Sequence, residues 1–231
     1  MIFRQFCTAD NEISYLLADP VTRMAALLDA NVLAAKDYYA AITAMDLTLT
    51  YVMETHAQES HQSAAAQFRE QFGSKLVAHS KAQLVCTDVI VNENDKLFLG
   101  EECIQVLGTP GHSECSLSYF WNDRVFTGHT LLAGTSGSCQ RDDSDAGDMF
   151  NSIRNKLLCL PGTTLVYPGR VNTGRCMSNV AQELIANIDI GTNMTEKSFI
   201  QYKQTEKLNK HRRQNYLAEN QNCKTYREQY T

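Results

Sequence analysis

Four predicted strands in this chain each end in a polar or glycine-rich element, and this pattern restricts the fold more than any other feature. Apolar runs end at ETHAQESH, TPGHS, GHT and YPGR, which begin at positions 54, 109, 128 and 167. In α/β proteins, ligand sites gather at the carboxyl ends of strands. The pattern therefore predicts an α/β fold in which these four elements form a polar site.

The order of predicted strands and helices supports this fold class. Strands are expected at 13–19, 24–30, 47–53, 76–79, 95–108 (a pair that turns at Gly100), 116–121, 124–128 and 163–169. Helices are expected at 31–45, 62–72, 148–158 and 177–189. Strands followed by a helix occur twice, which indicates helices covering mixed sheets. We expect a single domain over residues 1–231, with 194–231 as a helical, polar C-terminal extension.

Composition and charge argue against two classes of protein. The chain has 231 residues and a formal net charge of −5, whereas general nucleic-acid binding needs a basic surface. No apolar run approaches the roughly 20 residues of a membrane span. The first residues lack the basic and then apolar pattern of a secretory signal. We therefore expect a cytoplasmic protein that binds neither nucleic acid nor membrane.

The eight cysteines form no CxxC pair, and most lie in apolar contexts. In a chain without an export signal, such cysteines are expected to be reduced and buried. Cys139 differs because it lies in a polar loop of glycine and serine, and it is a candidate reactive thiol.

Four of the six histidines, His56, His61, His112 and His129, fall at three of the strand ends. Histidine is the commonest metal ligand near neutral pH. A single histidine at a strand end is more often structural, whereas three that converge form a site. The residues alone leave both interpretations open.

The strand-end elements occur in the order of a known family, together with VFTGHTLL at 125–132 and LPGTTLVYPGR at 160–170. They resemble THxHxDH, TPGHT, FTGDALL and LPG…YPGH of the metallo-β-lactamase fold superfamily, most closely its persulfide dioxygenase (glyoxalase II-like) branch. The resemblance covers about residues 2–188. It implies a four-layer αββα sandwich with two mixed sheets and a metal at the edge between them.

Several metal-ligand positions of that family are altered here. Gln58 and Ser60 replace a histidine and an aspartate, and Arg170 replaces the last histidine. The second metal of the two-metal hydrolases would use positions 60, 61 and 170, of which only His61 remains. A guanidinium cannot ligate a metal because it is always protonated. The resemblance therefore disfavours a two-metal site.

The persulfide dioxygenases use one iron, and their ligands correspond to His56, His112 and His129 here. The usual two histidines and one carboxylate thus become three histidines. The resemblance implies one divalent metal, with Fe(II) favoured and Zn(II) as the alternative. We expect His61 and Gln58 to support catalysis from beside the ligands.

Substrate recognition is less well defined by the resemblance. The family arginine that helps to bind glutathione corresponds to Ser138, and Arg141 follows three residues later. Arg141 and Arg170 are candidates for binding a substrate anion, with a surface role as the alternative for each. The implied partner is a small-molecule thiol or persulfide, and a homodimer is compatible with the family.

Three functions follow from these residues. The first is a persulfide dioxygenase-like enzyme that oxidises a glutathione-type persulfide or related thiol with O₂ to sulfite. The second is a degenerate, non-catalytic member of the fold that binds a small ligand or a partner. The third, a minor alternative, is a metal-dependent hydrolase of the glyoxalase II type.

Overall fold

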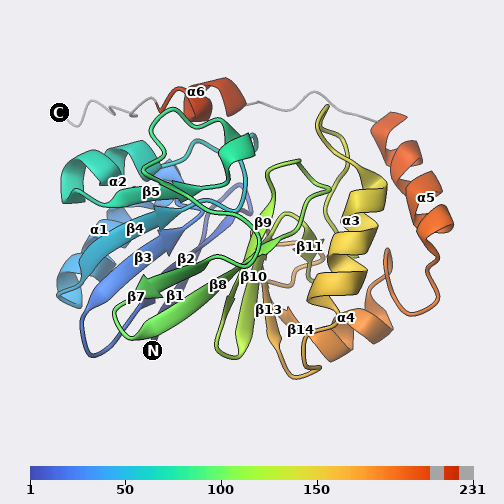
Figure 1. Cartoon of the computed structure of the whole chain (residues 1–231), viewed down its shortest axis with the longest axis horizontal. Coiled ribbons are helices and arrows are strands. Elements are labelled where there is room, and N and C mark those ends of the chain that lie inside the picture. Colours follow the sequence, from blue (N-terminus) through green and yellow to red (C-terminus); the bar gives the residue numbers. More distant parts are fainter. Residues whose placement is uncertain (209–215, 224–231) are drawn as a thin grey trace. The chain divides into compact units, whose positions relative to one another are not determined.

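The computed structural model describes residues 1–208 and 216–223. These residues form two compact units (Figure 1). The first unit contains residues 1–91, 98–102 and 216–223, and the second contains residues 92–97 and 103–208. Of the predicted C-terminal extension, 209–215 and 224–231 lie outside the described residues. The single domain over residues 1–231 stays a prediction.

The first unit is built on a six-stranded mixed sheet. Its strands, in spatial order, are β1 (Ile2–Cys7), β2 (Ile13–Ala18), β3 (Met24–Leu28), β4 (Thr48–Met53), β5 (Lys75–Ala78) and β6 (Val89–Ile90). The pairs β1–β2 and β2–β3 are antiparallel, and the strands from β3 to β6 are parallel. The strands from β3 onwards therefore end at the same edge of the sheet, where β4 is followed by the first predicted ligand segment.

Helices cover one face of this sheet. They are α1 (Ala35–Ala44) and α2 (Ala65–Phe72), with the 3-10 turns η1 (Val32–Ala34) and η2 (Ser80–Ala82) and the short helix α6 (Leu217–Gln221). Tyr38 and Ile42 of α1 and Phe68 of α2 lie in one buried cluster with Leu27 and Val52 of the sheet. Burying such side chains contributes about 1.5–3 kcal/mol each, so this layer fixes the course of β3 and β4.

Another six-stranded mixed sheet lies mostly in the second unit, with residues 98, 99 and 102 of its strands assigned to the first unit. Its strands, in spatial order, are β14 (Ser178–Asn179), β13 (Leu165–Pro168), β10 (Arg124–Gly128), β9 (Leu117–Trp121), β8 (Glu102–Gly108) and β7 (Lys96–Leu99). Only β10 and β13 pair in parallel among the registers of β8 to β14. A small hairpin of β11 (Leu131–Leu132) and β12 (Thr135–Ser136) follows β10.

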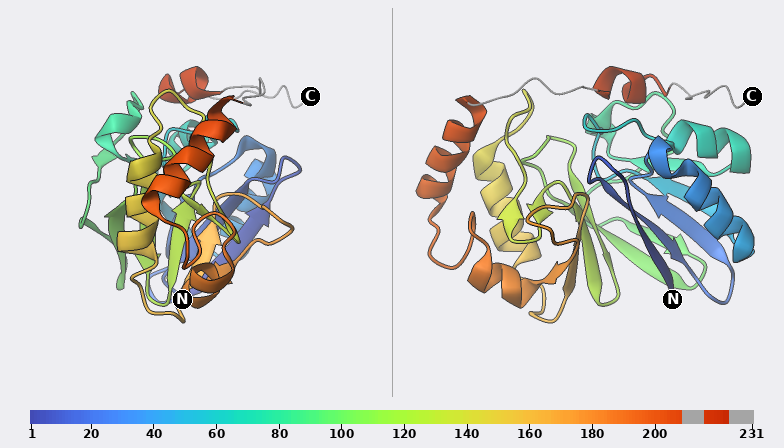
Figure 2. Two further views of the ribbon diagram at one scale, coloured as in Figure 1. Left: turned by 90° about the vertical axis from the view of Figure 1, so that its right-hand side faces the viewer. Right: turned by 180° about the vertical axis from the view of Figure 1, so that it is seen from behind.

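The helices of the second unit are α3 (Ala146–Ser152), the π-helical turn η3 (Ile153–Leu157), α4 (Val180–Ala186) and α5 (Glu196–Leu208). Helices α3 and α5 lie side by side (Figure 2), and the ring centroids of Phe150 and Phe199 are 5.7 Å apart. Phe199 and Ile153 share a buried cluster with Val125 and Val166 of the sheet. This packing holds β10 and β13, which carry two of the predicted site elements.

The predicted α/β fold with two mixed sheets is confirmed, and some elements differ in extent. Strand β1 was not expected from the periodicity. Helix α4 spans only residues 180–186 of the predicted 177–189, because a capping box of Asn179 and Gln182 starts it and Asn187 is extended. No helix among the described residues is long and apolar enough to cross a membrane.

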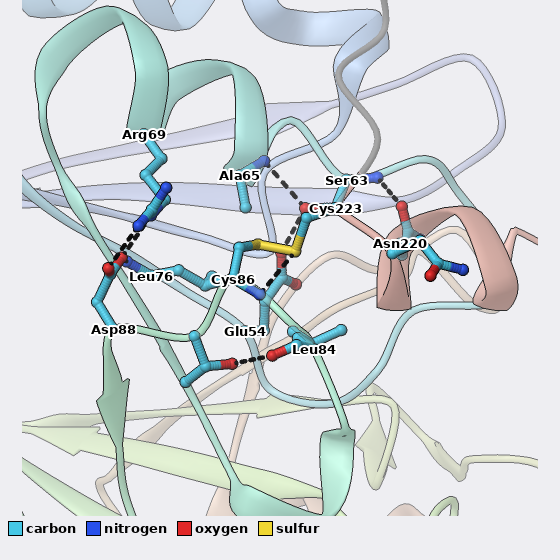
Figure 3. Close-up of a disulfide and its surroundings, with 12 residues drawn as sticks. Glu54, Ser63, Ala65, Arg69, Leu76, Leu84, Cys86, Asp88, Asn220 and Cys223 are labelled. Carbon is cyan, nitrogen blue, oxygen red and sulfur yellow. Dashed lines mark hydrogen bonds and ion pairs between the residues drawn. A yellow bond between two sulfur atoms is a disulfide. The ribbon is translucent and has the colours of Figure 1, made fainter.

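The expectation that the cysteines are reduced and buried is wrong in part. Cys86 and Cys223, 137 positions apart in the chain, form a disulfide (Figure 3). Among the described thiols, Cys7, Cys103 and Cys159 are exposed, whereas Cys115 and Cys139 are buried. The pairing depends on a fold contact that brings a C-terminal segment to the loop after β5, and nothing in the spacing of the cysteines predicted it.

Candidate metal centre

His56 lies in the loop that follows β4 and is held by a hydrogen-bonded relay. The Thr55 hydroxyl donates to Asp29 Oδ2 at 2.8 Å, and His56 Nδ1 lies 2.9 Å from the same hydroxyl oxygen. Because the hydroxyl has one proton, and the carboxylate receives it, the oxygen accepts from the Nδ1–H of His56. The neutral ring then carries its lone pair on Nε2. Metal-binding histidines are typically oriented by such a bond through the other nitrogen.

Gln58 occupies the position of a family histidine and makes a different set of contacts. Its Nε2 donates to Asp29 Oδ1 at 2.9 Å and to Glu54 Oε2 at 3.4 Å. Burial, followed by the charge of Asp29, raises the pKa of Glu54 to about 8. The side chain of Gln58 is thus bound to two carboxyl groups of its own unit.

His61 lies in the same unit, buried beside a carboxylate. Its Nδ1 is 3.8 Å from Glu12 Oε2, and both side chains are 3% exposed. Burial lowers the pKa of His61, but the neighbouring carboxylate of Glu12 outweighs this effect, and the net shift of the pKa is upward. A protonated imidazole carries a proton on each nitrogen and cannot ligate a metal. The pairing with Glu12 therefore favours a supporting role for His61 over ligation.

In the second unit, His112 follows β8 in the TPGH turn. Its Nδ1 donates to the carbonyl oxygen of Ser138 at 2.9 Å, which leaves the lone pair of the neutral ring on Nε2. Burial, and then the neighbouring His129, lower the pKa of His112 to about 3. The imidazole is therefore neutral at physiological pH, which is the form that binds metals.

His129 follows β10 and faces His112 within the second unit. The two ring centroids are 5.1 Å apart, and the rings offer ligand nitrogens within 4.8 Å of one another. Gly128 has φ +50°, and a Cβ at Gly169 would lie 3.1 Å from His129 Cδ2. The glycines of both motifs thus allow the ring to fit against the backbone, and the predicted His112 and His129 are brought together.

The two candidate arginines also lie in the second unit. Arg141 is 5% exposed, and its Nε and Nη2 donate to the two carboxylate oxygens of Asp143 at 2.8 and 3.3 Å. This pairing places a carboxylate directly beside the guanidinium. Arg170 follows β13 and is half-buried. The structure thus places Arg170 at a strand end, as expected, and gives Arg141 an intramolecular partner.

Sequence reasoning missed the residues that orient the ligands. Asp29 directly follows β3, so the same strand-end pattern that singled out His56 could have found it. Asn220, whose side chain bonds the backbone of Gln58 and His61, lies some 160 positions away and gave no signal.

Known proteins resemble this chain in sequence and in structure, although no family model matches it. Persulfide dioxygenase ETHE1, mitochondrial, from Mus musculus is 27% identical over 176 residues, which are 75% of this chain and 69% of that protein. Hydroxyacylglutathione hydrolase from Brucella ovis is 32% identical over 174 residues, which are 72% of this chain and 64% of that protein. The crystal structure of ETHE1 from Myxococcus xanthus has a TM-score of 0.87 at 34% identity and covers 92% of this chain and 93% of its own.

The chain belongs to the metallo-β-lactamase superfamily. A metallo-β-lactamase structure from Staphylococcus aureus, 21% identical, has a TM-score of 0.84 and supports the fold. The predicted resemblance to the persulfide dioxygenase (glyoxalase II-like) branch is confirmed. Membership of the metallo-β-lactamase superfamily implies a metal site, and the donors fit one, because His56 and His112 each hold Nδ1–H in a hydrogen bond and so present Nε2.

Proposed function

We propose that this protein is a persulfide dioxygenase-like enzyme that uses one metal ion and oxidises a glutathione-type persulfide or related thiol with O₂ to sulfite. The main support for the proposal is the protonation and hydrogen bonding of the residues at the family's ligand positions. His112 is neutral beside His129, whereas Gln58 is bound to carboxyl groups where a two-metal enzyme needs a histidine. The similarity to ETHE1 proteins supports the same reaction class.

In this proposal, His56, His112 and His129 hold one divalent metal, with Fe(II) favoured and Zn(II) as the alternative. Fe(II), when bound, would supply the redox chemistry that combines sulfur with O₂. The Thr55–Asp29 relay and the carbonyl of Ser138 orient two of the rings. Three neutral imidazoles leave the charge of the metal uncompensated, which favours a thiolate or persulfide anion as the substrate.

The overall reaction balances without a further oxidant. One persulfide, one O₂ and one water give one thiol, one sulfite and two protons, and the outer sulfur is oxidised while O₂ is reduced. Arg170, half-buried just after β13, and Arg141, paired with Asp143, are the candidates for holding the substrate anion. His61 and Gln58 position the loop after β4. A cytoplasmic location and a homodimer remain part of the proposal.

The paired arginine supports a second candidate, a non-catalytic member of the fold that binds a small ligand or a partner. With Arg141 bound to Asp143, and Ser138 in place of the family arginine, the glutathione-binding group of the family is altered. A hydrolase of the hydroxyacylglutathione type has the support of a 32% identical relative, but it would need the metal ligands that Ser60 and Arg170 replace.

Metal content and activity test the proposal together. Untagged wild-type protein is compared with His129→Ala and with His61→Ala by mass spectrometry of bound metals, followed by O₂ consumption with glutathione persulfide. We expect about one iron per chain in the wild type and in His61→Ala, and none in His129→Ala. Zinc with no O₂ consumption would reject the oxygenase chemistry, and no metal in any sample would favour the binding protein.

A further inference from the structure

The short helix α6 is bound to the loop that carries His56. Asn220 of α6 is 9% exposed, and its Nδ2 donates to the carbonyl oxygens of Gln58 and His61 at 3.0 and 2.9 Å. Its Oδ1 accepts from the backbone N–H of Ser63 at 2.9 Å. We name the loop from His56 to Ser63 the ligand loop, and the Asn220 side chain satisfies three of its backbone groups.

The other side of α6 is bound to the loop between β5 and β6. The backbone N–H of Val85 donates to the carbonyl oxygen of Gln221 at 3.0 Å, and Cys223 forms the disulfide with Cys86. Figure 3 shows the disulfide next to Ser63 and Asn220. Helix α6 therefore bridges two loops that are separate in sequence.

The loop that carries Cys86 is itself firmly held. Arg69 of α2 donates to both carboxylate oxygens of Asp88 at 2.7 and 2.8 Å, and the N–H of Leu76 donates to the same carboxylate at 2.9 Å. These bonds, visible in Figure 3, tie the segment to α2 and β5. Cys86 is thus on an anchored loop.

Cys223, in contrast, follows a helix of only five residues. A helix this short has no stability of its own in water, so its position depends on tertiary bonds. The disulfide is the one covalent bond among the contacts described for α6.

The disulfide is also near the ligand loop's connection to the sheet. Ser63 Oγ donates to Glu54 Oε1 and accepts from the N–H of Ala65 at 3.1 Å. A cavity of about 20 Å³, room for roughly one water, is lined by the disulfide cysteines together with Glu54, His56, Gln58 and Asn220. A change in the position of α6 would therefore act on the backbone and the packing next to His56.

We propose that the Cys86–Cys223 disulfide is a thiol-sensitive latch that holds α6 on the ligand loop and so positions His56. Both cysteines are half-buried, so a small thiolate can reach the sulfur atoms. Two equivalents of a low-molecular-weight thiol break the S–S bond, give the thiols of Cys86 and Cys223, and are oxidised to their own disulfide. Asn220 is the positioning residue through which the latch acts.

Hydrogen exchange on the full-length protein tests the latch without reference to metal or activity. The purified protein is measured oxidised, after reduction with dithiothreitol, and after reoxidation. Reduction should accelerate exchange in residues 59–63 and 216–223 about tenfold, the factor that losing roughly one hydrogen bond's net stabilisation gives. Reoxidation should restore protection.

Matched variants make the test specific. Cys86→Ser and Cys223→Ser should exchange fast in both conditions, whereas Cys7→Ser, at an exposed free cysteine, should respond to reductant as the wild type does. Asn220→Ala should form the disulfide but exchange fast in residues 59–63 even when oxidised. Only a latch that acts through Asn220 gives this combination.

Two results would overturn the latch. One is eight titratable thiols in the oxidised protein, which would mean that no disulfide forms. The other is unchanged exchange in residues 59–63 after complete reduction. One consequence of the latch rests on the proposed function: the reduced protein should lose bound metal faster than the oxidised protein. If metal never binds but exchange responds to reduction, the latch stands and the proposed function fails.

Discussion

At the scale of single residues, proton positions decide which histidines can bind a metal. Thr55 stands between Asp29 and His56 and has only one proton to give. The Ser138 carbonyl has the same effect on His112. His61 is different, because its carboxylate neighbour Glu12 favours the protonated ring. As residue types, the rings of His56, His112 and His61 are equally good metal ligands. Their neighbours determine which rings present a nitrogen lone pair.

Thr55→Val tests the relay. It keeps the shape of the side chain and removes the oxygen that accepts from His56, so the ring loses its orientation. We expect metal affinity to fall by about 10–100-fold, the usual effect of losing such a partner, as measured by competition with a chromophoric chelator. Thr50→Val, on the preceding strand β4, is the control and should bind as the wild type does. Unchanged affinity in Thr55→Val would remove the relay from the mechanism.

The pairing of His61 with Glu12 predicts a pH dependence of stability. The pKa of His61 is raised above 6.5 in the folded protein, so the pair stabilises the fold fully below pH 6.5. That contribution is lost as the pH rises through the folded pKa, with a slope of at most about 1.4 kcal/mol per pH unit. Urea unfolding between pH 6 and 9 should show a shallower decline in His61→Gln than in the wild type. Parallel curves would contradict the pairing.

The strand-end pattern singled out His112 and His129, and the structure places their rings together because β8 and β10 belong to one sheet. Their role as metal ligands stays a prediction. The partners Thr55, Asp29 and Glu12 were not predicted, since a hydrogen bond depends on side-chain positions that strand periodicity does not encode.

At the scale of elements, turns after the strands place the candidate ligands. Gly111 in the TPGH turn has φ +136°, and a Cβ there would lie 2.3 Å from the Cα of Met149 in α3. The turn therefore packs directly on the backbone of that helix. Helix α3 in turn is held by α5, so the second unit supports His112 from behind.

Gly111→Ala, compared with a second glycine variant, tests whether the contact with α3 costs stability beyond the cost of positive φ. We expect a loss of about 2–4 kcal/mol in the free energy of unfolding, from an unfavourable φ together with overpacking. Gly174→Ala is the matched control, because Gly174 also has positive φ (+73°) but has open space around its Cα. It should lose only about 1–2 kcal/mol. Equal midpoints in urea for the two variants would show that the contact with α3 does not matter.

Long-range connections between elements were the least predictable part. The strand at 47–53 and the hairpin at 116–128 were expected from periodicity and turn residues, and both are present. The contact of α6 with the ligand loop and its disulfide was not expected. This contact joins segments about 140–160 positions apart. The sequence of a short polar helix contains no pattern from which its packing partner can be predicted.

At the scale of the whole molecule, the two units carry different parts of the proposed ligand set. His56 belongs to the first unit, and His112 and His129 belong to the second. If one metal ion binds all three, it cross-links both units, and its binding free energy adds to the stability of the whole chain. The metal would then hold parts of the whole chain together, as the disulfide holds α6 to a loop within the first unit.

Metal removal tests this cross-link. At a free metal concentration 100 times the dissociation constant, binding to the folded state adds about 2.7 kcal/mol, so chelation should lower the melting temperature and broaden or split the transition. His56→Ala and His112→Ala should each abolish the response to added Fe(II), although they lie in different units. His79→Ala, at the cap of η2, should retain it. If one of the two ligand variants kept the full response, the metal would be held within a single unit, and the three-histidine site would be wrong.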